Sequence, residues 1–263
     1  MNADHPSELT TAAPESVEPT SVWSKMFSIF AAPGEVFEEI RNTKPATANW
    51  LVPTLLSCLV GIVFSVVVLS QPDILAASSQ QQEAQFQKSV DAGKMTLQQM
   101  EQRMEGMQKI FTPALMMSIG ITFSLVGPFV FLFILAALSW LLAAKVFKGR
   151  VNFMKAFELV GLAGMINVLG GLLTMFVVLL KGDLNAAPNA ALLLDSFDPA
   201  NVSHQLLGAL NIFTIWFMLV LAIGVSRVTG RSLGGAAGWI FGFWLVVRGV
   251  MAVGSVALAK LQS

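Results

Sequence analysis

Five long apolar stretches constrain the fold of this chain more than any other feature of its sequence. A bilayer core about 30 Å thick needs about 20 apolar residues per helix, and every stretch is long enough. The second stretch exceeds one span and contains Gly127-Pro128, so we expect it to tilt, kink or begin outside the bilayer. The chain is predicted to be an all-α, polytopic integral membrane protein with five transmembrane helices. The stretches cover residues 50–70, 112–144, 159–180, 205–226 and 232–259.

The charge content supports this class. Only 12% of the 263 residues are charged, whereas a soluble globular chain carries about 25%. So few charges do not cover a water-facing surface, which argues against a soluble enzyme. The net charge is zero, so the composition gives no reason to expect a nucleic-acid partner.

The basic residues between the spans predict the orientation. Under alternating topology, the three basic flanks fall on one side, and short cytoplasmic loops are enriched in Lys and Arg. The opposite loop, residues 181–204, holds one Lys against three Asp. We therefore predict a cytoplasmic N-terminus and a C-terminus outside. The basic residues are Lys25, Arg41 and Lys44, then Lys145, Lys148, Arg150 and Lys155, then Arg227 and Arg231.

The chain divides into three predicted regions. Residues 1–22 are acidic and lack the basic start and apolar run of a cleavable signal peptide, so we expect a disordered cytoplasmic tail. Residues 23–46 are predicted to form interfacial amphipathic helices. Residues 47–263 are the predicted five-helix transmembrane domain, which includes an external helical insert at residues 71–111.

The interfacial region contains two short amphipathic segments separated by Pro33. We expect such helices to lie flat in the headgroup region with their apolar side down. On one interpretation they only seat the protein on the inner leaflet, and on the other they form a docking surface for a cytoplasmic partner. The candidate interface residues are Trp23, Phe27, Phe30, Val36, Phe37 and Ile40.

The external insert is predicted to be a helical hairpin between the first and second spans. Its second arm begins with a capping box at Thr96 and Gln99, and we expect this arm to run on into the second span. The arm carries an a/d seam that packs either on the first arm or on a second subunit, so a homo-oligomer stays open. The seam consists of Leu97, Met100, Met104, Met107 and Phe111.

Three polar residues lie within the apolar stretches. Arg248 and Asn167 fall at similar depth by helix rise, and Glu158 lies near the cytoplasmic end of its span. An Arg at this depth is costly unless it faces protein or water or snorkels. The three residues are therefore a candidate intramembrane polar site that binds a headgroup, an anion or a substrate. The alternative interpretation is a structural hydrogen-bonded lock.

Small residues suggest how the spans pack. Gly238 and Gly242 form a GxxxG spacing on the fifth span, which permits close helix contact. Glycines also thin the third span, so we expect the third span to lie at the centre against the fifth. A dimer seam is the alternative use of the GxxxG face.

Motifs for catalysis, cofactors and metals are not found. The sequence has no phosphate-binding loop, no dinucleotide fingerprint after a strand, and no His-Glu-x-x-His, Cys-x-x-Cys or Gly-x-Ser-x-Gly pattern. We therefore expect no enzymatic activity, no cofactor and no metal site.

Several short motifs occur along the chain in a particular order and spacing, from about Phe27 onward. They begin just before the first span and end in the fourth. The motifs are Phe30-x-x-Pro33-x-Glu35-Val36-Phe37-x-x-Ile40, Lys44-Pro45, Trp50-Leu51-Val52-Pro53, Gly149-x-Val151-x-Phe153-x-Lys155-Ala156-Phe157, Asp183-Leu184-Asn185, Asp195-x-x-Asp198-Pro199, Asn211-Ile212-Phe213-Thr214-Ile215-Trp216 and Leu221-Ala222-Ile223-Gly224.

With these motifs the chain resembles the Yip (Ypt-interacting protein) domain family in its bacterial form. The resemblance implies five transmembrane helices with the N-terminus inside and the C-terminus outside, and it implies the bacterial cytoplasmic membrane. In eukaryotes the family implies binding to small prenylated GTPases and roles in vesicle traffic. For bacterial members it implies no defined activity.

Two functions remain as expectations. The first is a non-enzymatic integral membrane protein that organises the bilayer or binds a membrane or cytoplasmic protein partner. The second is a small transporter or channel component with a mid-membrane polar site around Arg248. A transporter predicts a water-accessible cavity that reaches Arg248 between broken helices.

Overall fold

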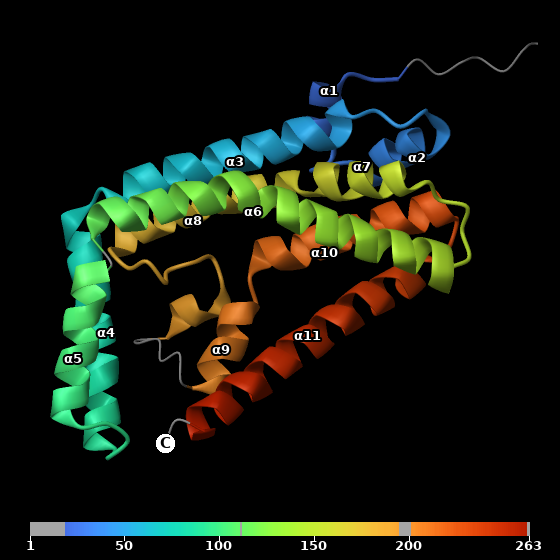
Figure 1. Ribbon diagram of the computed structural model, residues 1–263. Helices are drawn as coiled ribbons and strands as arrows, with labels where there is room; N and C mark the ends of the chain where they lie inside the picture. Colours follow the sequence, from blue (N-terminus) through green and yellow to red (C-terminus); the bar gives the residue numbers. More distant parts are fainter. Residues whose placement is uncertain (1–18, 111, 195–200, 262–263) are drawn as a thin grey trace, which may run out of the picture.

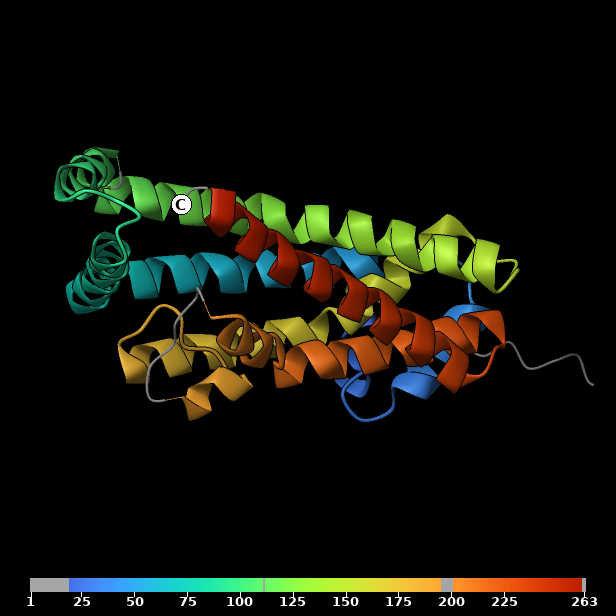
Figure 2. The ribbon, with the colours of Figure 1, turned by 90° about the horizontal axis from the view of Figure 1, so that it is seen from below.

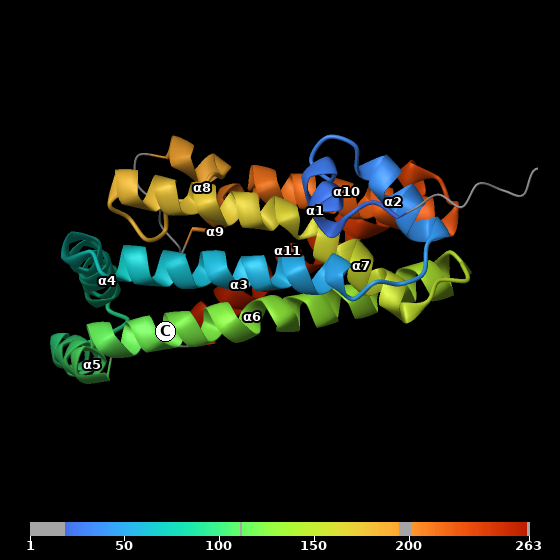
Figure 3. The ribbon, with the colours of Figure 1, turned by 90° about the horizontal axis from the view of Figure 1, so that it is seen from above.

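In a computed structural model, five helices are long and apolar enough to cross a membrane, which confirms the predicted all-α, five-span fold. The structure describes residues 19–110, 112–194 and 201–261, so most of the predicted tail, residues 1–22, lies outside the described residues. The spans run side by side in Figures 1 and 3. They are α3 (Ala48–Leu69), α6 (Pro113–Leu141) with the π-helical turn η1 (Leu142–Val146), the pair α7 (Phe153–Ala163) and α8 (Met165–Lys181), α10 (Ile212–Thr229), and α11 (Leu233–Leu261).

Local capping residues set the bounds of these spans. Asn152 and Asn211 accept hydrogen bonds from the first backbone N–H groups of α7 and α10, as Asn does at an N-cap. Gly182 and Gly230 end α8 and α10 with φ of 65° and 67°, a left-handed conformation that glycine adopts without a steric penalty. The third span therefore begins at Phe153, earlier than its apolar stretch indicated.

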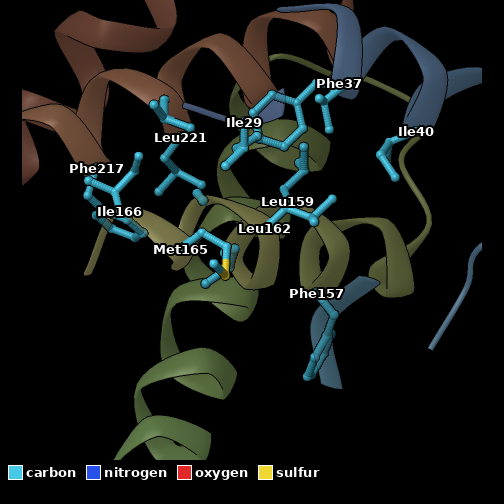
Figure 4. Close-up of a cluster of buried hydrophobic side chains, with 14 of the residues drawn as sticks. Ile29, Phe37, Ile40, Phe157, Leu159, Leu162, Met165, Ile166, Phe217 and Leu221 are labelled. Carbon is cyan, nitrogen blue, oxygen red and sulfur yellow. The ribbon is translucent and has the colours of Figure 1, made fainter. Parts of the chain in front are cut away.

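The third span lies at the centre of the bundle. α7 and α8 contact α3, and α7 also contacts α6, whereas both contact α10. Every residue of α7 from Lys155 onward is buried. Figure 4 shows the core around this helix, to which α7, α8, α10 and the N-terminal helices all contribute side chains. The labelled core residues are Ile29, Phe37, Ile40, Phe157, Leu159, Leu162, Met165, Ile166, Phe217 and Leu221.

The expected contact between the third and fifth spans is wrong. α11 packs on α10 and on the short helix α9 (Val202–Ala209), and Figure 2 shows it crossing the bundle obliquely. Only 6% of its apolar window is buried. A Cβ at Gly238 or Gly242 would meet no atom within 4 Å. The GxxxG face is thus not packed within one chain, because α11 turns most of its surface away from the bundle.

Two short helices, α1 (Val22–Ser28) and α2 (Pro33–Asn42), pack on the bundle at the end where α7 begins. Phe37 of α2 sits in a space left by Gly224 of α10, where a Cβ would lie 3.0 Å from the Phe37 ring. The Phe30 ring lies edge-on to Trp216, with centroids 5.9 Å apart. Both helices therefore contribute side chains to the core of the bundle.

The insert forms a hairpin, α4 (Pro72–Asp91) and α5 (Leu97–Ile110), at the opposite end of the bundle. The predicted capping box is confirmed, since Gln99 N–H donates to Thr96 Oγ1 at 3.2 Å and Thr96 N–H donates to Gln99 Oε1 at 3.0 Å. α5 contacts α4. The expectation that this arm continues into the second span is wrong, because Thr112 caps a new helix that begins at Pro113.

Candidate functional site

The most deeply buried charge in the bundle is Glu158 of α7, which is 0% exposed. Its Oε1 accepts hydrogen bonds from Asn49 Nδ2 at 2.7 Å and from the Ala46 backbone N–H at 3.0 Å. Its Oε2 lies 3.1 Å from Lys155 Nζ and accepts no hydrogen bond among the described residues. Glu158 therefore holds the entry of the first span against the start of the third.

Lys155 extends this contact to α2. Its ammonium group donates to the carbonyl oxygens of Ile40 and Thr43, the latter at 2.7 Å. Both carbonyls lie at the C-terminal end of α2, where the last carbonyls have no partner within the helix and a cation is favourable. One buried Lys thus caps α2 and neutralises Glu158.

A second buried ion pair joins the two N-terminal helices. Lys25 Nζ of α1 lies 2.9 Å from Glu39 Oε1 of α2, and it also donates to the Thr20 carbonyl oxygen at 2.6 Å. The Thr20 backbone N–H and hydroxyl donate to the Glu39 carboxylate at 2.8 and 2.7 Å. α1 and α2 are therefore fixed to each other by a satisfied charge network.

This network acts on the ionisation of Glu39. Burial alone raises the pKa of the carboxyl group, but the hydrogen bonds from Thr20 and the adjacent Lys25 ammonium together outweigh burial. The net effect holds the pKa of Glu39 below its ordinary value of 4.5. The carboxylate is thus charged at neutral pH, as the ion pair requires.

Arg248 lies apart from these groups, near the middle of α11. It is half-buried, and its guanidinium group lies 5.9 Å from the centroid of the Trp244 ring, a cation–π distance. Within the described ranges, no side chain or carbonyl forms a hydrogen bond or ion pair with Arg248.

Asn167 lines a cavity of about 380 Å³ between α3, α6 and the junction of α7 with α8. Its amide has no hydrogen-bond partner among the residues that the structure describes. The cavity is lined by Pro53, Thr54, Ser57, Gly127, Pro128, Phe131, Leu132, Val160, Gly161, Gly164 and Asn167.

The structure does not bring the three predicted polar residues together. Glu158 pairs with Lys155, Asn167 faces the cavity, and Arg248 rests on Trp244. The expected pairing of Arg248 with Asn167 fails because α11 packs on α9 and α10 and not against α8. Equal depth in the membrane does not place two helices side by side.

The six candidate interface residues divide into two groups. Val36, Phe37 and Ile40 are buried in the core, and Phe30 is half-buried against Trp216. Trp23 and Phe27 point outward from α1 and are 58% and 73% exposed. Only these last two side chains offer a substantial outer surface.

Sequence reasoning missed the contacts of Glu158 and Glu39. Lys155 and Lys25 were predicted to indicate orientation and not to form ion pairs, and neither Asn49 nor Glu39 was a candidate site residue. The i,i+3 spacing of Lys155 and Glu158 is a local signal of an ion pair. For Lys25 the signal is its place between Trp23 and Phe27 on an otherwise apolar helix. No such signal links Asn49 to Glu158, because they are far apart in the sequence.

The basic ends of the spans gather at the end of the bundle that carries α2. A second cavity of about 660 Å³ lies there between α2 and the loop that joins α10 to α11. Arg41, Arg227 and Arg231 line it together with Glu35 and Glu38. Residues that are predicted to lie on one side of the membrane therefore lie at one end of the molecule.

The family model of the Yip1 domain matches residues 27–256 of this chain. The chain belongs to the Yip1 domain family. The match begins at the last two residues of α1 and ends within α11, so it covers α2, the α4–α5 hairpin, the first four spans and most of the fifth. This confirms the family resemblance of the short motifs.

Among curated relatives, the Yip1 domain protein is similar to the membrane protein YknW of Bacillus subtilis (strain 168). The two are 26% identical over 239 residues, which is 90% of this chain and 91% of the relative. No solved structure matches the chain significantly. The Yip1 domain protein is thus a multi-pass membrane protein by its helices, its family and this relative.

Proposed function

We propose that this protein is a non-enzymatic membrane protein that organises the lipid around its N-terminal helices. The main support for the proposal is that α1 buries its charged side chain and exposes its aromatic side chains. Its Lys25 side chain points inward, whereas Trp23 and Phe27 point outward. A helix that faces water exposes its Lys and buries its aromatic residues. The pattern of α1 suits a helix whose outer side lies in lipid.

The position of α1 supports the same conclusion. Phe30, just after α1, contacts Trp216, which lies only one turn after the start of α10. Trp216 is therefore about 20 Å along the helix axis from Thr229 at the other end of α10. The N-terminal segment thus reaches well into the depth of the spans. At this depth the exposed side chains of Trp23 and Phe27 lie beside acyl chains, which suits apolar aromatic residues.

The orientation that we propose puts the α2 end of the bundle at the cytoplasmic face of a bacterial cytoplasmic membrane. The cluster of Arg41, Arg227 and Arg231 at the α2 end fits the excess of positive charge on cytoplasmic loops. The N-terminus is then cytoplasmic and the C-terminus outside. Labelling of Lys148→Cys and Ser70→Cys in intact cells, each in a Cys58→Ala background, tests this, since only Ser70→Cys is expected to react with an impermeant reagent.

The exposure of α1 to lipid is tested by spin labelling. In the Cys58→Ala background, nitroxides at Trp23→Cys and Phe27→Cys are expected to be relaxed by oxygen, which concentrates in lipid, and not by a water-soluble nickel chelate. Lys44→Cys serves as the water-exposed control. Relaxation of both α1 labels by the chelate would overturn the proposal and favour a docking surface for a cytoplasmic protein.

The effect on lipid is tested in vesicles that contain the full-length protein. The wild type is expected to change the mean vesicle diameter with increasing protein-to-lipid ratio, because helices inserted in one leaflet expand that leaflet. Trp23→Ala with Phe27→Ala is expected to weaken this effect. The matched control is Trp239→Ala with Phe243→Ala on α11, where both aromatic side chains are similarly exposed. Equal loss in both variants would contradict a specific role of α1.

A transport function centred on Arg248 has less support. Arg248 lines neither of the two cavities described above. An oligomer through the α11 glycines, or a protein partner, stays a prediction. Either would be detected as a second chain in a mild-detergent purification.

A further inference from the structure

At the walls of the cavity that contains Asn167, two spans contain a proline and a third is interrupted. Pro53 lies within α3 and Pro128 within α6, and Gly164 separates α7 from α8. Proline lacks an N–H group and bends a helix away from its preceding turn. Pro53, Pro128 and Gly164 all line this one cavity, and spaces between helices are among the places where binding sites form in helical membrane proteins.

The polar side chains in this cavity differ in the hydrogen bonds that they can still form with a ligand. The Thr54 hydroxyl donates to the Trp50 carbonyl at 2.6 Å, and the Ser57 hydroxyl donates to the Pro53 carbonyl at 3.0 Å. Both hydroxyl oxygens can therefore only accept from a ligand. The Asn167 amide is unpaired among the described residues and offers two N–H donors and one carbonyl acceptor. The cavity thus presents donors for a carbonyl and acceptors for a hydroxyl.

The lining excludes a charged ligand. None of the lining residues is ionisable, and a charged group buried there would have no counter-charge. The remaining lining is apolar, and Phe131 of α6, one of the lining residues, is 48% exposed. In a membrane such an exposed side chain faces acyl chains, so we expect a ligand to reach the cavity sideways from the bilayer. A volume of about 380 Å³ lies within the range of small-molecule sites.

From this chemistry we infer that the cavity between α3, α6 and the α7–α8 junction binds an uncharged membrane lipid of the diacylglycerol class. The ester carbonyl of the lipid accepts from the Asn167 amide, and its free hydroxyl donates to the Thr54 or Ser57 oxygen. The start of an acyl chain lies along Phe131 and Leu132. The phosphate of a phospholipid is excluded because no cation lines the cavity.

The test uses photolabelling of the full-length protein in phosphatidylcholine vesicles. The probe is diacylglycerol with a diazirine in one acyl chain, and labelled peptides are identified by mass spectrometry. The wild type is expected to carry saturable label on the peptides that hold Phe131 and Asn167, and excess unlabelled diacylglycerol is expected to remove it. Label that rises linearly with probe and resists competition would show a lipid annulus only and would overturn the inference.

Two variants locate the site. Gly127→Leu is expected to abolish the saturable label by filling the cavity, since a Cβ there meets no atom within 4 Å. Asn167→Leu is expected to weaken binding about fivefold, as loss of one hydrogen bond does. Gly242→Leu on α11 is the control, because its Cβ also meets nothing, and it is expected to label like the wild type. Unchanged labelling in both cavity variants would overturn the inference.

A second probe tests the absence of charge. Phosphatidylglycerol with the same diazirine chain is expected to give no saturable label at these peptides. If it labels them as strongly as diacylglycerol does, the cavity does not discriminate the headgroup and the inference fails. If Gly127→Leu does not fold, as judged by thermal unfolding in detergent, the competition experiment and the Asn167→Leu variant still test whether the cavity binds diacylglycerol.

Discussion

The Lys155 ammonium lies 3.1 Å from the Glu158 carboxylate one turn further along α7, and both side chains are almost fully buried. Through its other hydrogen bonds this pair joins α2, the entry of α3 and the start of α7. The start of α7 thus meets the end of α2 and the adjoining entry of α3, more than a hundred residues earlier in the sequence, at two adjacent charges.

Removal of Lys155 is expected to be strongly destabilising. In Lys155→Met the buried Glu158 loses its counter-charge, and breaking such a pair costs about 3–5 kcal/mol. In the double variant Lys155→Met with Glu158→Leu, no unpaired charge remains, so the loss should be smaller. Thermal unfolding in detergent, followed by tryptophan fluorescence, measures both. An equal loss in the single and double variants would show that the pair is not the source of the effect.

Acid is expected to loosen α1 from α2. The folded-state pKa of Glu39 lies below 4.5, so the ion pair with Lys25 contributes fully above that pH and is lost as the pH falls through the lowered pKa. Hydrogen exchange of α1 and α2, corrected for the intrinsic pH dependence, measures the loosening. Glu39→Gln should exchange faster at neutral pH and respond less to acid. A variant with the acid response of the wild type would rule out Glu39 as the cause.

Gly161→Ala is expected to separate the first and third spans. A Cβ at Gly161 would lie 2.4 Å from Trp50 Cα and 2.6 Å from Trp50 Cβ, so one backbone must move. Overpacking of this kind costs about 1–3 kcal/mol. Gly127→Ala is the matched control at the same cavity, where the new methyl group has space, and it should be neutral within about 0.5 kcal/mol. Thermal unfolding compares them, and equal stabilities would contradict the tight contact.

Arg248→Leu is expected to leave stability nearly unchanged. The side chain has only the Trp244 ring as a partner within the described part of the chain, and such a contact contributes about 0.5–1 kcal/mol at an accessible site. The measurement is the same thermal unfolding assay, with Lys155→Met as the reference. A loss as large as that of Lys155→Met would show that Arg248 has a buried partner.

The class of fold follows from local patterns in the sequence. Length and apolarity predict each span. In the bilayer core no water is present, so backbone N–H and C=O groups must form hydrogen bonds within the segment, as they do in a helix. Asn152, Asn211 and Gly230 act as caps through bonds to their own neighbours, and Thr96 with Gln99 does the same in the hairpin. These features depend on residues a few positions apart, so pattern and propensity suffice to predict them.

Which side chains contact one another depends on how the helices pack and is seen only in the tertiary structure. In a bilayer, apolar side chains suit lipid and protein equally, so hydropathy does not distinguish the central α7 from the peripheral α11. Phe37 is buried against Gly224 of α10, whereas Phe27 is exposed, although both belong to short amphipathic helices. Asn49 meets Glu158 across more than a hundred residues, and residues of three spans line the cavity beside Asn167. Such contacts follow from how helices pack, which no local pattern specifies.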